Sequence, residues 1–98
     1  MLLHMVTFTF KQSTSEDEII TFGTEMSQMG TQIPEVRSFR HGRDLGERTT
    51  NAHYGEVVEF GTADDFHTYL AHPEHQAFLA NHVMPLCERW SSVQFIPI

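Results

Sequence analysis

One short segment concentrates the side chains that are able to do chemistry. Residues 69–78 read YLAHPEHQAF and hold a tyrosine, two histidines and a proline. Pro73 has no amide hydrogen and disfavours helical geometry at the residue before it. A helix through Tyr69 is therefore expected to end near Ala71, and a new helix to begin with Pro73 at its first position. This break would place His75 in the first turn of the new helix.

The position expected for His75 suits a base that removes protons. The positive end of the helix dipole disfavours the imidazolium ion and keeps His75 neutral near pH 7, although Glu74 opposes this in part. A neutral imidazole in a pocket can remove a proton from the carbon next to a carbonyl group. The phenol of Tyr69 can donate a hydrogen bond to the enolate that forms. His75 as general base and Tyr69 as donor are thus the candidate catalytic residues.

Purely structural roles remain open for the same side chains. His75 can form a hydrogen bond within the fold, Tyr69 can pack against a sheet, and His72 can cap the helix. The histidine of the first strand, His4, lies among apolar neighbours and can equally be a hydrogen-bonded core residue. The segment therefore predicts a structural break and offers catalysis as one of its uses.

The seven histidines raise the question of a metal site. His72 and His75 are separated by the proline turn, and His75 and His82 would lie about 10 Å apart along a helix axis. No Cys-x-x-Cys or His-Glu-x-x-His motif accompanies them. Neither a nucleophile arrangement nor a phosphate-binding glycine loop is present. We therefore expect no metal and no cofactor.

Composition narrows the class of protein and of partner. The 98 residues suit one domain over 1–98, and a net charge of −7 argues against nucleic acid or an anionic membrane as partner. No leader and no apolar run near 18 residues is visible, so a cytoplasmic location is expected. Cys87, the single cysteine, excludes an intramolecular disulfide and is expected to be a buried thiol in a helical segment.

Hydrophobic periodicity predicts six elements. Strands with alternating apolar residues are expected at 2–10, 36–43, 53–60 and 92–98. A first helix is expected to follow a capping box formed by Ser15 and Glu18 and to run to about Gly30. A second helix is expected after Thr62 as N-cap; it breaks at Pro73 and resumes through Leu86.

The order of these elements, β-α-β-β-α-β, is that of a ferredoxin-like α+β fold with an antiparallel four-stranded sheet and both helices on one face. The other sheet face would remain bare. We expect Met5, Phe39 and either Val57 or Val58 to make that face apolar. An exposed apolar surface of this kind usually marks an interface, so a homodimer that closes sheet on sheet is expected.

Four segments together resemble one known family. The segments HMVTFTFK, IPEVRSFRHGRDL, YGEVVEF and YLAHPEHQAF are similar, in order and over essentially the whole chain, to the stress-responsive dimeric α/β barrel (Dabb) family. That resemblance implies a ferredoxin-like protomer whose sheet pairs with a second copy to form a barrel. The family includes plant stress proteins and polyketide cyclases such as olivetolic acid cyclase.

The resemblance also suggests roles for particular residues. In the cyclases a histidine is the general base of an aldol ring closure and a tyrosine lies beside it, and these positions match His75 and Tyr69. A histidine near the start of the first strand faces the same pocket and matches His4. This chain departs from the cyclases at Gly23, Met26 and Ser27, where larger walls would be expected, and at Glu56, a carboxylate placed toward the pocket. A smaller or more polar ligand than an alkyl-bearing polyketide is therefore expected.

Three functions remain in view. The favoured one is a homodimer that binds a small organic molecule in a pocket between sheet and helices. The alternatives are a cofactor-free cyclase or lyase with a histidine base, and a stress-protective oligomer without catalysis. The side chains expected to line the pocket are His4, Val6, Phe8, Phe22, Met26, Phe39, Phe78 and Leu79.

Overall fold

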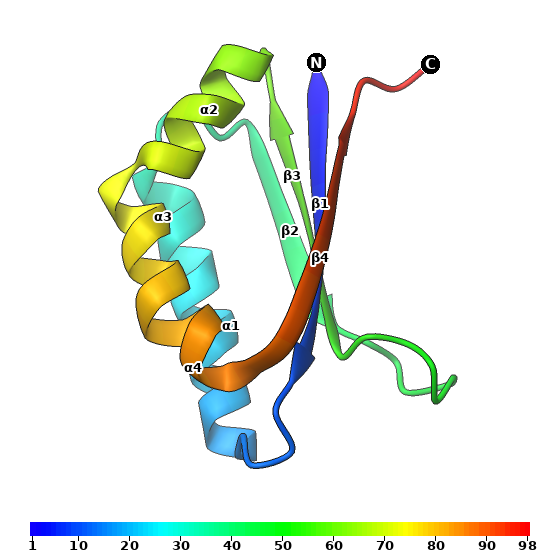
Figure 1. Ribbon diagram of the computed structural model, residues 1–98. Helices are drawn as coiled ribbons and strands as arrows, with labels where there is room; N and C mark the ends of the chain where they lie inside the picture. The colour runs from blue at the N-terminus through cyan, green and yellow to red at the C-terminus, as the bar shows by residue number, and fades with distance from the viewer.

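The computed structural model describes all residues from Met1 to Ile98 and has the expected ferredoxin-like topology (Figure 1). Its elements are β1 (Leu2–Phe10), α1 (Glu16–Gln32), β2 (Ser38–Arg43), β3 (Tyr54–Phe60), α2 (Ala63–Ala71), α3 (Pro73–Phe78), a π-helical turn (Leu79–Val83), α4 (Met84–Leu86) and β4 (Cys87–Phe95). The four strands form one antiparallel sheet in the order β2-β3-β1-β4. All helices cover one face of this sheet, and the other face has no cover within the chain.

Local hydrogen bonds explain where α1 begins. The Ser15 hydroxyl accepts from the Glu18 amide at 3.2 Å, and the Glu18 carboxylate accepts from the Ser15 amide at 2.9 Å, as the predicted capping box requires. The helix then buries Phe22, Met26 and Met29 against the sheet. It extends two residues beyond the expected end at Gly30, to Gln32.

The second helical region breaks where the proline predicts. Thr62 caps α2 by accepting from the Asp65 amide at 3.1 Å. His72 has extended backbone geometry, with φ −64° and ψ 136°, and α3 starts at Pro73. The ring of His72 caps this new helix, because its Nδ1 atom accepts from the Glu74 amide at 3.1 Å.

The last strand corrects the sequence-based expectation. The predicted strand at 92–98 is wrong in both bounds, since β4 runs from Cys87 to Phe95 and pairs along β1 from Leu3 to Phe10. A register shift between Thr9 and Phe10 lets the strand turn directly out of α4. Cys87 is buried as expected, but it opens a strand and is not part of a helix. The second strand also begins later than expected, at Ser38.

The two sheet faces differ in composition, and here one expectation fails. Phe39 and Val58 are directly opposed in the sheet and face the helices, not the bare side. Val58 is fully buried, and a Cβ atom placed on Gly30 would lie 2.9 Å from the Phe39 ring. On the uncovered face Met5 and Val57 are opposed, and the remaining apolar side chains there come from the same strand pair and from β4. They are Leu3, Val93 and Phe95.

Candidate functional site

A cavity of about 170 Å³ lies between the sheet and the α2–α3 region. Its sheet wall comes from β1, β3 and β4, and its helical wall from α1, α2, α3 and the π-helical turn. Thirteen residues line it, nine of them hydrophobic, and the other four are titratable or hydroxylic. Those that bear on its chemistry are His4, Glu56, Tyr69, His75 and Ser92.

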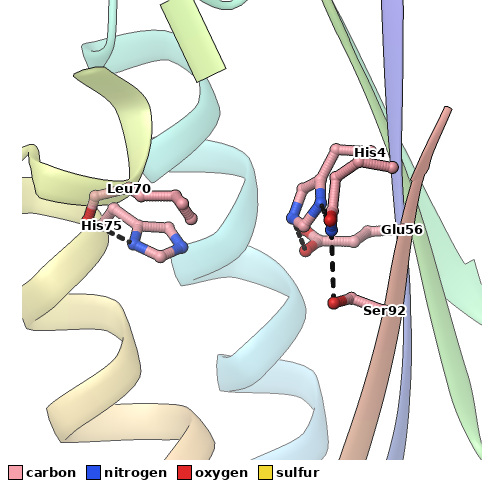
Figure 2. A network of polar contacts seen from close by, with 6 residues as sticks. His4, Glu56, Leu70, His75 and Ser92 are labelled. Atoms are coloured by element: carbon pink, nitrogen blue, oxygen red, sulfur yellow. Dashed lines mark hydrogen bonds and ion pairs between the residues drawn. The ribbon is translucent and has the colours of Figure 1, made fainter. Parts of the chain in front are cut away.

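His75 projects from the first turn of α3 into this cavity. Its Nδ1 atom lies 3.2 Å from the carbonyl oxygen of Leu70. A carbonyl oxygen only accepts, so the proton is on Nδ1 and the lone pair is on Nε2. Figure 2 shows the ring reaching from the helical wall toward His4 and Glu56 on the sheet wall.

Burial keeps His75 uncharged. His75 is 8% exposed, and this burial lowers its pKa below the usual value. The hydrogen bond to Leu70 opposes this lowering of the pKa, and the charge of His72 adds to it. The neutral state expected from the sequence therefore stands, but its main cause is desolvation and not the helix dipole. A neutral histidine with a free Nε2 lone pair can accept a proton from a molecule in the cavity.

Tyr69 lies against His75 and is fully buried. The two rings have centroids 4.5 Å apart, and the Tyr69 ring also packs against Phe60 at 5.0 Å. The phenolic oxygen is enclosed and has no hydrogen-bond partner in the protein. Burial, together with the nearby Glu56, raises the pKa of Tyr69, so the group remains a neutral O–H donor.

His4 and Glu56 form the polar part of the sheet wall (Figure 2). Gln94 donates from Nε2 to His4 Nδ1 at 2.9 Å, which places the His4 proton on Nε2. That nitrogen lies 4.0 Å from Glu56 Oε1, longer than a hydrogen bond. Burial raises the pKa of Glu56 to about 8 and, with His75, lowers the pKa of His4 to about 4. Both groups are therefore uncharged near neutral pH and do not form an ion pair.

The sequence prediction located part of this cavity. Tyr69, His75 and five of the eight expected lining residues surround it, namely His4, Val6, Phe8, Phe78 and Leu79. Phe22 and Met26 do not line it, because they are fully buried between α1 and the sheet. Phe39 lies at a separate surface depression with Ser27 and His41.

Other cavity residues were missed or misjudged. Gly23 and Ser27 do not form its walls: a Cβ atom on Gly23 would lie 3.0 Å from the Tyr54 hydroxyl, and Ser27 bonds to His41 at 2.7 Å. Trp90 on β4 was missed because the strand was expected to start later, at residue 92, and Ser92, inside the expected strand, was not singled out. The helical wall adds three apolar side chains that were not singled out, Met29, Leu70 and Val83.

The structure offers neither a cluster of metal ligands nor a membrane-spanning helix. No three His, Cys, Asp or Glu side chains come together in a way that would hold a metal ion. None of the helices has both the length and the apolar character needed to span a bilayer.

Solved structures share this fold over nearly the whole chain. A dimeric ferredoxin-like protein of unknown function from Thermobifida fusca is 28% identical, with a TM-score of 0.90 over 98% of this chain and 90% of that one. A Dabb family protein from Mesorhizobium loti is 25% identical, with a TM-score of 0.86 over 99% and 96%. The hydroxynitrile lyase of Passiflora edulis is 22% identical, with a TM-score of 0.87 over 99% and 93%, and at that identity the likeness concerns the fold alone.

Comparison of the sequence itself gives the family. No curated protein sequence matches this chain. The family model of the stress-responsive A/B barrel domain matches residues 2–97. The chain belongs to the stress-responsive A/B barrel domain family.

Proposed function

We propose that this chain forms a homodimer in which each protomer binds a small organic molecule in the cavity beside His75. The observation that carries this proposal is a pair of polar atoms without protein partners, Tyr69 Oη and Glu56 Oε2, in a largely apolar cavity. Buried polar atoms in native proteins are nearly always hydrogen-bonded, so two orphans in one cavity favour a bound molecule that supplies their partners.

The cavity volume limits the size of that molecule. A cavity of about 150 Å³ is enough for benzene, whereas sites for drug-sized ligands begin near 300 Å³. The 170 Å³ found here suits a single ring with a short substituent, or a branched chain of similar bulk. A polyketide with a long alkyl tail exceeds this space.

The uncovered sheet face supports the homodimer. Met5, Val57, Val93 and Phe95 present apolar side chains there, and Val93 is 54% exposed in the single chain. Apolar surface of this extent in a domain of 98 residues favours burial against a partner. The T. fusca protein, similar over 98% of this chain, is described as dimeric.

A titration with acetophenone, whose carbonyl oxygen can accept a hydrogen bond, tests ligand binding directly. In ¹H–¹⁵N spectra we expect the amide signals of cavity residues, such as Leu79 and Val83, to shift on addition of acetophenone. The variant Leu79→Phe fills part of the cavity and should weaken binding. Ile20→Phe, the same kind of change on the exposed side of α1, should not. Equal binding by both variants, or no binding at all, contradicts the proposal.

Cofactor-free proton transfer, as in a cyclase or lyase, is the second candidate. The free Nε2 lone pair of His75 faces the cavity and favours it. Acetophenone in D₂O offers a direct assay, because a base that removes a proton from its methyl group forms an enolate, which then takes deuterium from solvent.

The expected result separates a catalytic base from a structural histidine. Loss of a general base costs about 10²–10⁴ in rate, so His75→Ala should abolish catalysed exchange. His67→Ala, a change on the exposed side of α2, should leave it intact. Exchange that survives in His75→Ala excludes His75 as the base. Acetophenone binding without exchange leaves a binding protein, and the absence of both favours the stress-protective oligomer.

A further inference from the structure

Glu56 is the one carboxyl group in the cavity wall, and it has no cationic partner. The side chain is 5% exposed, and no lysine or arginine lines the cavity. A buried carboxylate without a cation or several hydrogen-bond donors is strongly disfavoured. Four titratable groups face Glu56 from its own and neighbouring elements: His4 on β1, Tyr54 on β3, Tyr69 on α2 and His75 on α3. His41 on β2 is opposed to Glu56 in the sheet, but its ring nitrogens are hydrogen-bonded to Tyr54 and Ser27.

The hydrogen bonds around Glu56 locate its proton. His4 carries its hydrogen on Nε2, which faces Oε1, so His4 cannot accept a proton from the carboxyl group. Oε2 has no protein partner of any kind. With a pKa of about 8, the group is protonated at neutral pH, and the free O–H is then on Oε2. A carboxylic acid held neutral in this way is a hydrogen-bond donor.

We infer that Glu56, as a neutral acid, donates a hydrogen bond to the ligand, and that with the Tyr69 hydroxyl it selects uncharged molecules that carry an acceptor oxygen. Ketones, aldehydes and esters of one-ring size belong to this class. Hydrocarbons leave both donors unpaired, and carboxylates bring a charge into a cavity without a cation. This inference rests on the proposed ligand site and adds the chemical class of the ligand.

Three probes of nearly the same planar shape test the inference. Acetophenone has a carbonyl oxygen where α-methylstyrene has a CH₂ group, and benzoate has a carboxylate. A net hydrogen bond contributes about 0.5–1.5 kcal/mol, so at pH 7 acetophenone should bind about threefold to tenfold more tightly than α-methylstyrene. Benzoate should bind most weakly. Equal affinities for acetophenone and α-methylstyrene at pH 7 would overturn the inference.

Raising the pH tests whether the donor is Glu56. Between pH 7 and 9.5 the carboxyl group ionises and loses its O–H, so the preference for acetophenone should shrink or disappear. Glu56→Gln keeps a donor and cannot ionise, so it should retain the preference at both pH values. Glu56→Met removes this donor and leaves only the Tyr69 hydroxyl, so its preference should be reduced at both pH values, while the exposed Glu47→Gln should behave as the wild type.

These outcomes distinguish the inference from the proposal beneath it. A preference whose pH dependence persists in Glu56→Gln overturns the role of Glu56, although the cavity still binds. Failure of all three probes to bind overturns the ligand site itself, and the inference with it. Folding of each variant can be verified by its ¹H–¹⁵N spectrum before titration.

Discussion

The imidazole of His75 and the main-chain carbonyl of Leu70 meet across the break between α2 and α3, with Nδ1 3.2 Å from the carbonyl oxygen. In a continuous helix this carbonyl would accept from the amide four residues later, that of Glu74. Here the Glu74 amide donates to the ring of His72. Because the ring of His72 accepts from the Glu74 amide, the Leu70 carbonyl is left to accept from His75 and so orients the His75 ring. Pro73, which breaks the helix, makes this exchange of hydrogen-bond partners possible.

This relationship predicts the protonation state of His75. We expect the Nδ1–H tautomer and a pKa below the usual value for histidine, because burial disfavours the charged ring. Long-range ¹H–¹⁵N NMR spectra recorded over a pH titration measure both, with His75→Gln to assign the signals. An Nε2–H tautomer, or a pKa above the usual value, would show that the proposed base is wrongly described.

Glu56 predicts an unusual loss of stability with rising pH. Its pKa is raised by burial to about 8, so the folded protein retains a proton that the unfolded chain has already released. The free energy of unfolding should therefore fall by roughly 1–2 kcal/mol between about pH 6.5 and 8. The contribution of His4, whose pKa is lowered to about 4, has the opposite sign and changes mainly below pH 6.5.

Urea denaturation at a fixed protein concentration measures this fall. Glu56→Gln should remove it, because the amide does not titrate. A wild type whose stability stays constant or rises over the same window would mean that Glu56 is ionised in the folded state, paired with a protonated His4.

Features that depend on neighbouring residues could be predicted from the sequence, whereas features that depend on distant residues could not. The capping box at Ser15 and the break at Pro73 depend on neighbouring residues, and the structure confirms both. The last strand failed because the helical spacing of Val83 and Leu86 continues to Trp90, which conceals the strand that starts at Cys87.

Which side chains line the cavity depends on how the helices pack across the sheet, and the hydrophobic periodicity of the sequence does not encode this packing. Phe22, Met26 and Met29 share the buried face of α1, yet only Met29 reaches the cavity. Phe39 was misplaced for a similar reason, since its contact with Gly30 arises from the packing of β2 against α1.

The two tyrosines offer a matched pair of substitutions. Tyr69→Phe removes a buried hydroxyl that has no partner, so the free energy of unfolding should be unchanged or higher by about 1 kcal/mol, while acetophenone binding weakens. Tyr54→Phe removes the hydroxyl bonded to His41 Nδ1 at 2.6 Å and should destabilise the protein by about 1 kcal/mol. Urea denaturation of the ligand-free variants measures both. Equal destabilisation by the two substitutions would indicate that Tyr69 has a partner in solution.

The uncovered sheet face predicts the state of assembly. Sedimentation equilibrium at micromolar concentration should show a dimer of the 11.3 kDa chain, and a monomer alone would contradict the proposal.

Val57, opposed to Met5 at the centre of that face, is the informative position. Val57→Asp would bury an unpaired charge at a cost of several kcal/mol, so it should dissociate the dimer and lower its stability. Ile20→Asp makes the same change on the exposed side of α1, where no partner is expected, and should leave the dimer intact. Dissociation by Ile20→Asp instead would place the interface on the helices.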